Sequence, residues 1–195
     1  MERASSEPLA NIGAAFSDGK SGDRVADVRS LERPLVERAR RGDREAYGEL
    51  YRLHHAAVFR LARFRLGGEQ AAEDAAAETF ARAWAALPRY RFTGAPFSAW
   101  LYAIARNVSA DEQRRRGRVE PRGTLPETSE TPQHEDRLAL AAAVAKLPKG
   151  QRAVVEMKFV LGLTNAEVAT ALGRSPGAVN AMQWRALRTL RRRLG

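Results

Sequence analysis

Polar side chains near the C-terminal end of the chain have the hydrogen-bonding groups that suit the edges of DNA bases. An asparagine amide pairs with adenine and an arginine guanidinium with guanine, and Asn180 and Arg185 are both expected on the outward side of a helix. The residues expected on that outward face are Gly177, Asn180, Ala181, Trp184, Arg185 and Arg188. Backbone amides near Ser175 are placed to hold a phosphate, and Arg174 is expected to turn outward toward another.

Two short helices joined by a tight turn would present this face, and the local sequence has the signals for both. Thr164 is expected to cap the first helix, and Ser175, followed by proline, the second. Ala169 is small enough for the helices to pack closely, and Gly173 supplies the positive φ of the turn. These features predict a helix-turn-helix whose second helix enters the major groove. A plain helical hairpin with a solvated arginine face is the alternative.

A second stretch interleaves arginines with aromatic rings. Such a mixture suits single-stranded nucleic acid, because rings stack on unpaired bases while guanidinium groups hold the backbone. The candidates are Arg89, Arg91, Phe92, Phe97, Trp100, Arg106, Asn107 and Arg114. Each aromatic side chain, taken singly, is also an ordinary core residue, so burial is the alternative.

Acidic side chains recur one turn apart on a third helical stretch. Asp74, Glu78 and Arg82 fall at i, i+4 and i+8, opposite the apolar side, and Glu73 adds to the same face. Carboxylates one turn apart repel mildly on an isolated helix, and a cationic protein partner would reverse the sign of that effect. We interpret these four residues as a protein-binding face, with a solvated polar surface as the alternative.

Apolar residues recur with helical spacing along most of the chain, and no convincing alternation predicts a strand. The predicted fold class is all-α: two small helical domains joined by a flexible acidic linker, the C-terminal domain being the helix-turn-helix. Residues 1–30 are expected to form a disordered tail. Residues 31–118 form the first domain, 119–134 the linker and 135–195 the second domain.

Composition favours a polyanionic partner and argues against catalysis. The 195 residues carry a formal net charge of +10, which suits nucleic acid or an acidic membrane surface. There is no cysteine, so disulfides and thiolate sites are excluded. His54, His55 and His134 lack metal-ligand spacing with a carboxylate cluster, and no glycine-rich phosphate loop is present. We expect no catalytic residue, no metal and no cofactor.

Signals for export or membrane insertion are not found in the sequence. No apolar run approaches the length of a membrane span, and the N-terminal stretch lacks the apolar core of a signal peptide. The expected location is therefore the cytoplasm.

Taken together, these motifs resemble a bacterial RNA polymerase sigma factor of the extracytoplasmic-function (ECF) type. In chain order the resemblance is carried by GDREAYGELYRLH, AAEDAAAETFARAWAAL and FSAWLYAIARNVSADEQRRR, and after the linker by LPKGQRAVVEMKFVLGLTNAEVATALGRSPGAVNAMQWRALRTLRR. It covers nearly everything from about Leu31 to Leu194. The stretch after Val179 departs from the more basic texture usual in the family, and only Arg185 keeps that pattern.

The resemblance implies a subunit without catalysis of its own, which binds core RNA polymerase and directs promoter recognition, DNA melting and transcription initiation. It assigns the helix-turn-helix residues to the double-stranded −35 element and places that domain on the β flap. It assigns the arginine and aromatic set to the melted −10 element, and the acidic face to the β′ clamp helices. An anti-sigma factor is a further implied partner.

Two rival hypotheses come from other classes of protein. A stand-alone helix-turn-helix regulator would normally be a dimer on a palindrome, and it leaves the linker and the acidic face without a role. An enzyme acting on nucleic acid would be revealed by hydrolysis of a nucleotide by the clean protein.

Overall fold

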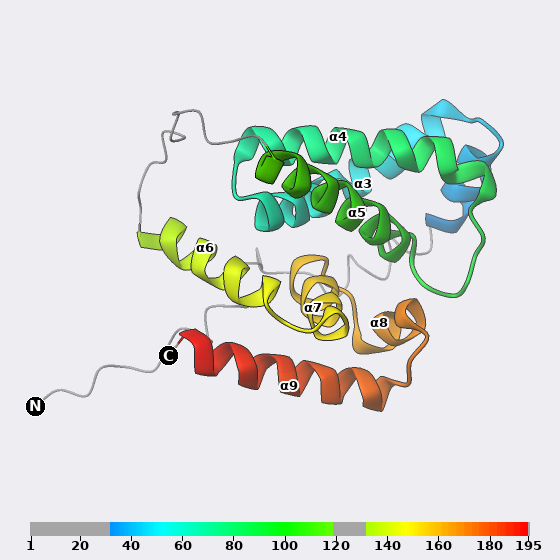
Figure 1. Cartoon of the computed structure of the whole chain (residues 1–195). Coiled ribbons are helices and arrows are strands. Elements are labelled where there is room, and N and C mark those ends of the chain that lie inside the picture. The colour runs from blue at the N-terminus through cyan, green and yellow to red at the C-terminus, as the bar shows by residue number, and fades with distance from the viewer. Residues whose placement is uncertain (1–31, 119–131, 195) are drawn as a thin grey trace, which may run out of the picture.

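The computed structural model of the chain describes residues 32–118 and 132–194, which form helices joined by short turns (Figure 1). Within these two ranges there is no strand, so the predicted all-α class is confirmed. The predicted tail over residues 1–30, and residues 119–131 of the linker predicted over 119–134, lie outside the described residues.

The first module begins with a helical stretch over residues 32–40, which we call the leading helix. It continues with α3 (Arg44–Leu66), α4 (Glu69–Ala86), the 3-10 turn η1 (Leu87–Arg89) and α5 (Phe97–Arg118). Asp43 caps α3, because its carboxylate accepts the Ala46 N–H at 3.0 Å. Gly67 then ends α3 with a φ of 79°, a conformation that glycine adopts without strain.

The second module consists of α6 (Pro132–Ala145), α7 (Lys149–Val155), the π-helical turn η2 (Glu156–Val160), α8 (Asn165–Leu172) and α9 (Pro176–Leu194). Helix α6 starts ahead of residue 135, the boundary expected from the sequence. A proline at the first helical position and Glu135 in the first turn both favour a helix start there. In Figure 1, α9 lies on the side of the molecule away from α4.

The two modules pack against each other through a buried ion pair. Helix α3 contacts α6 and η2, and α5 contacts α8. Arg65 on α3 donates from Nη1 to both carboxylate oxygens of Glu156, at 2.6 and 2.9 Å, and the Tyr102 hydroxyl donates to the same carboxylate at 2.8 Å. The Arg65 and Glu156 side chains are 6% and 2% exposed. A carboxylate so deeply buried is tolerable only with such partners, because an unpaired buried charge is costly.

Candidate nucleic-acid interface

Helix α8 begins with a reciprocal cap. The Thr164 hydroxyl accepts the Glu167 N–H at 3.3 Å, and the Glu167 carboxylate accepts the Thr164 N–H at 2.8 Å. This arrangement satisfies two of the N–H groups that a helix leaves free at its start. The prediction that Thr164 caps this helix is therefore confirmed.

The turn between α8 and α9 has the geometry of a helix-turn-helix. Gly173 has a φ of 60°, in the left-handed region, and the Arg174 N–H returns to the Ala169 carbonyl at 2.9 Å. The Ser175 hydroxyl accepts the Ala178 N–H at 3.2 Å and so caps α9. Three small or branched side chains at the crossing are almost completely buried: Val168, Ala169 and Val179.

The outward face of α9 carries most of the residues predicted to contact duplex DNA. Those that lie exposed are Arg174, Ser175, Gly177, Asn180, Trp184, Arg185 and Arg188, while Ala181 is half-buried. Trp184 is 61% exposed, and the Arg188 guanidinium lies 5.0 Å from the centre of its ring. A large exposed indole beside a cation is unusual for a solvated face, and it offers a ligand both an apolar and a charged contact.

Asn180 is held by a neighbour that the sequence analysis did not single out. The side-chain amide of Asn165, the first residue of α8, donates to the Asn180 side-chain oxygen. The contact links the start of α8 to the outward face of α9. Asn165 therefore restricts the orientation of a residue predicted to read a base.

The residues predicted to contact single strands divide into a surface set and one buried ring. The surface set is Arg89, Arg91, Phe92, Arg106, Asn107 and Arg114. Trp100 is half-buried, and Phe97 is only 2% exposed. Phe97 packs 5.2 Å from Trp100 and 5.5 Å from Tyr90, measured between ring centres. In this structure Phe97 supports the outer rings and does not itself face solvent.

The acidic face of α4 is open to solvent, as predicted. Glu73, Asp74, Glu78 and Arg82 are all exposed. Local pairs moderate the charge, because Arg82 Nε donates to Glu78 at 2.7 Å and the Gln70 amide donates to Asp74 at 3.1 Å. The face therefore presents carboxylates that remain accessible to a cationic partner.

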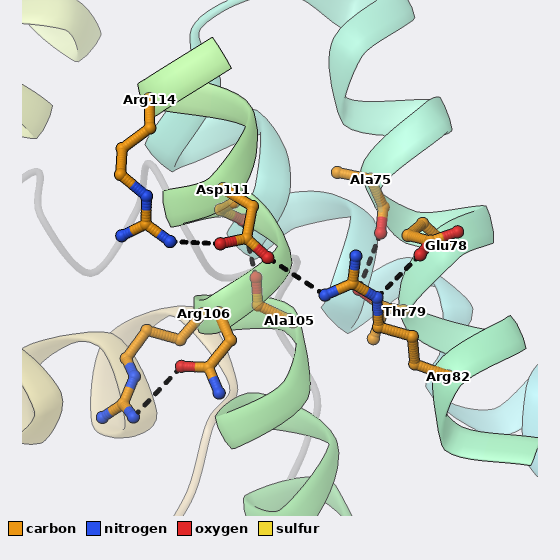
Figure 2. Close-up of polar contacts among 10 residues, drawn as sticks. Ala75, Glu78, Thr79, Arg82, Ala105, Arg106, Asp111 and Arg114 are labelled. Atoms are coloured by element: carbon orange, nitrogen blue, oxygen red, sulfur yellow. Dashed lines mark hydrogen bonds and ion pairs between the residues drawn. The ribbon is translucent and has the colours of Figure 1, made fainter. Parts of the chain in front are cut away.

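Arg82 also ties this face to α5, through a residue that the sequence analysis missed. Its Nη1 donates to Asp111 at 3.1 Å, and Asp111 also pairs with Arg114 (Figure 2). The hydrogen bonds that Arg82 donates to Glu78 and then to Asp111 raise the pKa of Arg82, and the hydrogen bond from Arg82 lowers the pKa of Asp111. The link between Asp111 and Arg82 could not have been found from sequence spacing, because the two residues lie on different helices. One chain of ion pairs thus links the acidic face of α4 to Arg114 on α5.

Neither a metal cluster nor a membrane span is found in the described parts of the chain. Over residues 32–118 and 132–194, no group of three or more His, Asp or Glu side chains could hold an ion. No described helix combines the length and the apolar character needed to cross a bilayer.

Comparisons with known proteins match each of the two modules to a known protein family. Residues 50–119 match sigma-70 region 2, and residues 137–190 match sigma-70 region 4. The ECF RNA polymerase sigma factor BldN of Streptomyces coelicolor is 38% identical over 170 residues, which are 82% of this chain but 64% of that protein. The ECF sigma factor ShbA of Streptomyces griseus subsp. griseus is 36% identical over 176 residues, 80% of this chain and 92% of that protein.

A solved structure also resembles this fold. CnrH, in a complex with the cytosolic domain of CnrY, aligns with a TM-score of 0.62 at 28% identity, over 82% of this chain and 94% of that chain. Fold and surface together define a two-module helical protein with a DNA-binding helix-turn-helix. The chain belongs to the family of ECF RNA polymerase sigma factors.

Proposed function

We propose that this chain is a specificity subunit that binds core RNA polymerase in the cytoplasm and directs it to promoters, without catalysis of its own. The observation that carries the proposal is that one chain presents a capped helix-turn-helix with an exposed basic face and, on the other module, an exposed acidic face beside exposed arginines and rings. Each surface suits a different part of a transcription complex.

The exposed residues of α9 would bind the −35 element as duplex DNA. Arg185 and Asn180 have the groups that recognise base edges, and Arg174 and Ser175 lie where a phosphate would meet the start of the helix. This module would also contact the β flap.

The surface arginines and rings of the first module would hold the −10 element after it melts. Arg89, Arg91 and Arg106 supply backbone contacts, and Phe92 and Trp100 supply stacking surfaces. Asn107 and Arg114 lie on α5, as Trp100 and Arg106 do.

The acidic face of α4 would bind the β′ clamp helices. We expect the double variant Asp74→Lys, Glu78→Lys to lower affinity for core polymerase, because it turns two attractive contacts into repulsive ones. The matched control reverses two other glutamates of the same module, Glu45→Lys and Glu49→Lys, and should leave the dissociation constant unchanged. Equal affinity for the α4 variant and the control would remove the clamp assignment.

An anti-sigma factor is the second protein partner of the proposal. CnrH, whose fold aligns with most of this chain, was solved in a complex with the cytosolic domain of CnrY. A regulator of this kind would bind the chain in competition with core polymerase, so adding it should release the chain from the holoenzyme.

A further inference from the structure

The leading helix contacts the segment proposed to capture unpaired bases. It lies ahead of the part that matches sigma-70 region 2, which begins at residue 50. Two neighbouring side chains at its start reach that segment. Glu32 is buried, at 9% exposure, whereas the Arg33 side chain is 73% exposed.

Glu32 holds the start of α5. One of its carboxylate oxygens accepts the backbone N–H of Phe97, the first residue of that helix, at 3.3 Å. The other oxygen lies 3.0 Å from Nε2 of His54 on α3. The carboxylate satisfies an N–H that a helix leaves free at its beginning, and its negative charge lies at the positive end of the helix dipole. One buried group therefore joins the leading helix, α3 and α5.

The start of α5 also supports a cluster of aromatic rings. The Phe97 ring packs on Trp100, and Tyr90 lies 5.5 Å from Phe97 and 5.2 Å from Phe92 between ring centres. Tyr90 and Phe97 are buried, whereas Phe92 is 36% exposed and Trp100 is half-buried. The buried rings set the orientation of the outer ones. A shift at the start of α5 would therefore move the two rings proposed to stack on bases.

Arg33 contacts the outermost ring directly. Its guanidinium carbon lies 5.2 Å from the centre of the Phe92 ring, and its Nε pairs with Glu37 at 3.1 Å. Both Arg33 and Phe92 are exposed, so this contact is open to a ligand that offers a base and a phosphate. An arginine beside an exposed ring is the arrangement by which proteins bind single strands.

We infer that the leading helix is part of the site for unpaired DNA: Glu32 positions the stacking rings through the start of α5, and Arg33 contacts the backbone of the single strand beside Phe92. This inference rests on the proposed function, in which that segment captures the melted −10 strand. The alternative is that Glu32 only stabilises the folded module and that Arg33 only solvates its surface.

The role of Glu32 is tested in the reconstituted holoenzyme. The probe is a fluorescent oligonucleotide with the non-template −10 sequence of a promoter found by run-off transcription, and binding is followed by anisotropy. Glu32→Ala should weaken strand binding about tenfold, the effect of losing one charge-assisted hydrogen bond, with core affinity unchanged. Glu32→Gln keeps an acceptor oxygen for Phe97 and should lose only about threefold. Glu45→Ala, an exposed glutamate on α3, is the control and should bind as wild type.

Other outcomes separate this inference from the proposed function. If Glu32→Ala loses no more strand binding than core affinity, Glu32 only stabilises the fold. If the alanine variant does not fold, unchanged strand binding in Glu32→Gln would lead to the same conclusion. Hydrogen exchange at the Phe97 amide of the free protein should be faster in Glu32→Ala than in Glu32→Gln, and equal rates would contradict the contact. A wild-type chain that forms no holoenzyme would instead contradict the proposed function.

Arg33 is tested through the salt dependence of the same binding reaction. Each phosphate contact to a single strand contributes about 0.7 to the slope of log affinity against log salt concentration. Arg33→Ala should lower the slope by about that amount, and Arg33→Lys should preserve it. Arg44→Ala removes an exposed arginine at the start of α3 and should leave the slope unchanged. A slope for Arg33→Ala equal to that of wild type would overturn the backbone contact.

Discussion

Arg185 lies exposed on α9, next to Trp184 in the sequence, and its guanidinium group can face a ligand. The exposure of this face matters because a side chain already used inside the fold would have to give up that contact before it could bind a base. Arg185 can therefore bind DNA without first breaking a contact inside the fold.

Arg185→Ala should weaken promoter-directed transcription without changing affinity for core polymerase. The loss of a base-edge contact costs about 1–3 kcal/mol, so we expect a decrease of roughly five- to 150-fold in promoter binding. Arg191→Ala removes an exposed arginine from the last turn of α9, outside the proposed contact set, and serves as the control. Run-off transcription checks the effect, and equal output from the Arg185 variant and the control would contradict the assignment.

The Asp111 carboxylate should make stability depend on pH. Its pKa is lowered in the folded protein, chiefly by the hydrogen bond from Arg82. A group with a lowered folded pKa stabilises the protein above its unfolded pKa, and that contribution disappears as the pH falls through the folded value. Asp111→Asn should therefore unfold at lower urea concentration than wild type at pH 7, and the difference should vanish in strong acid. A difference that persists in acid would show that another effect separates the two proteins.

Sequence reasoning succeeded on residues whose role depends on local spacing and missed those whose partners are distant. The outward face of α9 follows from the helical period alone, so Asn180, Trp184 and Arg185 were placed correctly on the surface. Phe97 was proposed as a strand contact, yet it is buried; spacing cannot tell which ring of an aromatic cluster lies underneath. The contact between Asp111 and Arg82 was missed because the two residues lie on different helices.

Among the elements, the helix-turn-helix is the one whose construction the sequence predicts best. The caps at Thr164 and Ser175 and the turn at Gly173 all depend on residues within a few positions of each other. In contrast, the π-helical turn η2 had no recognisable signal. The stretch is apolar apart from Glu156 and Lys158, and neither residue reveals the turn.

Substitution of Gly173 should test the turn. Gly173→Ala places a Cβ on a residue with a φ of 60°, and nothing else lies within 4 Å of that Cβ, so the cost is backbone strain of about 1–2 kcal/mol. The same change at Gly48, in the interior of α3, removes only a flexible residue from a helix and should stabilise by about 0.5–1 kcal/mol. Urea unfolding measures both. A neutral Gly173→Ala would mean that the turn does not need the left-handed conformation.

At the scale of the whole molecule, the packed arrangement of the two modules is too small to span a promoter. A compact fold of about 150 residues has a radius of gyration of about 15 Å. Elements at −35 and −10 are about 25 base pairs apart, which is about 85 Å of duplex. If each module binds its own element, the modules must separate, and the buried pair between Arg65 and Glu156 must break.

Glu156→Gln should loosen the contact between the modules. The variant leaves the Arg65 guanidinium buried without its counter-charge, and removing one member of such a pair typically costs about 3–5 kcal/mol. Small-angle X-ray scattering should then give a larger radius of gyration than for wild type. Glu135→Gln changes an exposed residue of α6 and should leave the radius unchanged. An unchanged radius for Glu156→Gln would show that other contacts hold the modules together.

Two modules could be recognised in the sequence, but their packing could not. Each module has its own apolar periodicity and caps, so its helices follow from local signals. Arg65, Tyr102 and Glu156 come together across long separations in the chain, and each looked ordinary at its own position. A buried polar contact of this kind depends on three-dimensional packing, which residue spacing does not encode.

The measurement that tests the central claim most directly is gel filtration of the purified chain with core RNA polymerase, with and without an excess of a competitor sigma factor. The account predicts that the chain co-elutes with the core enzyme and that the competitor displaces it. A folded chain, free of any inhibitor, that elutes apart from the polymerase and binds duplex DNA tightly by itself would contradict the account and favour a stand-alone regulator.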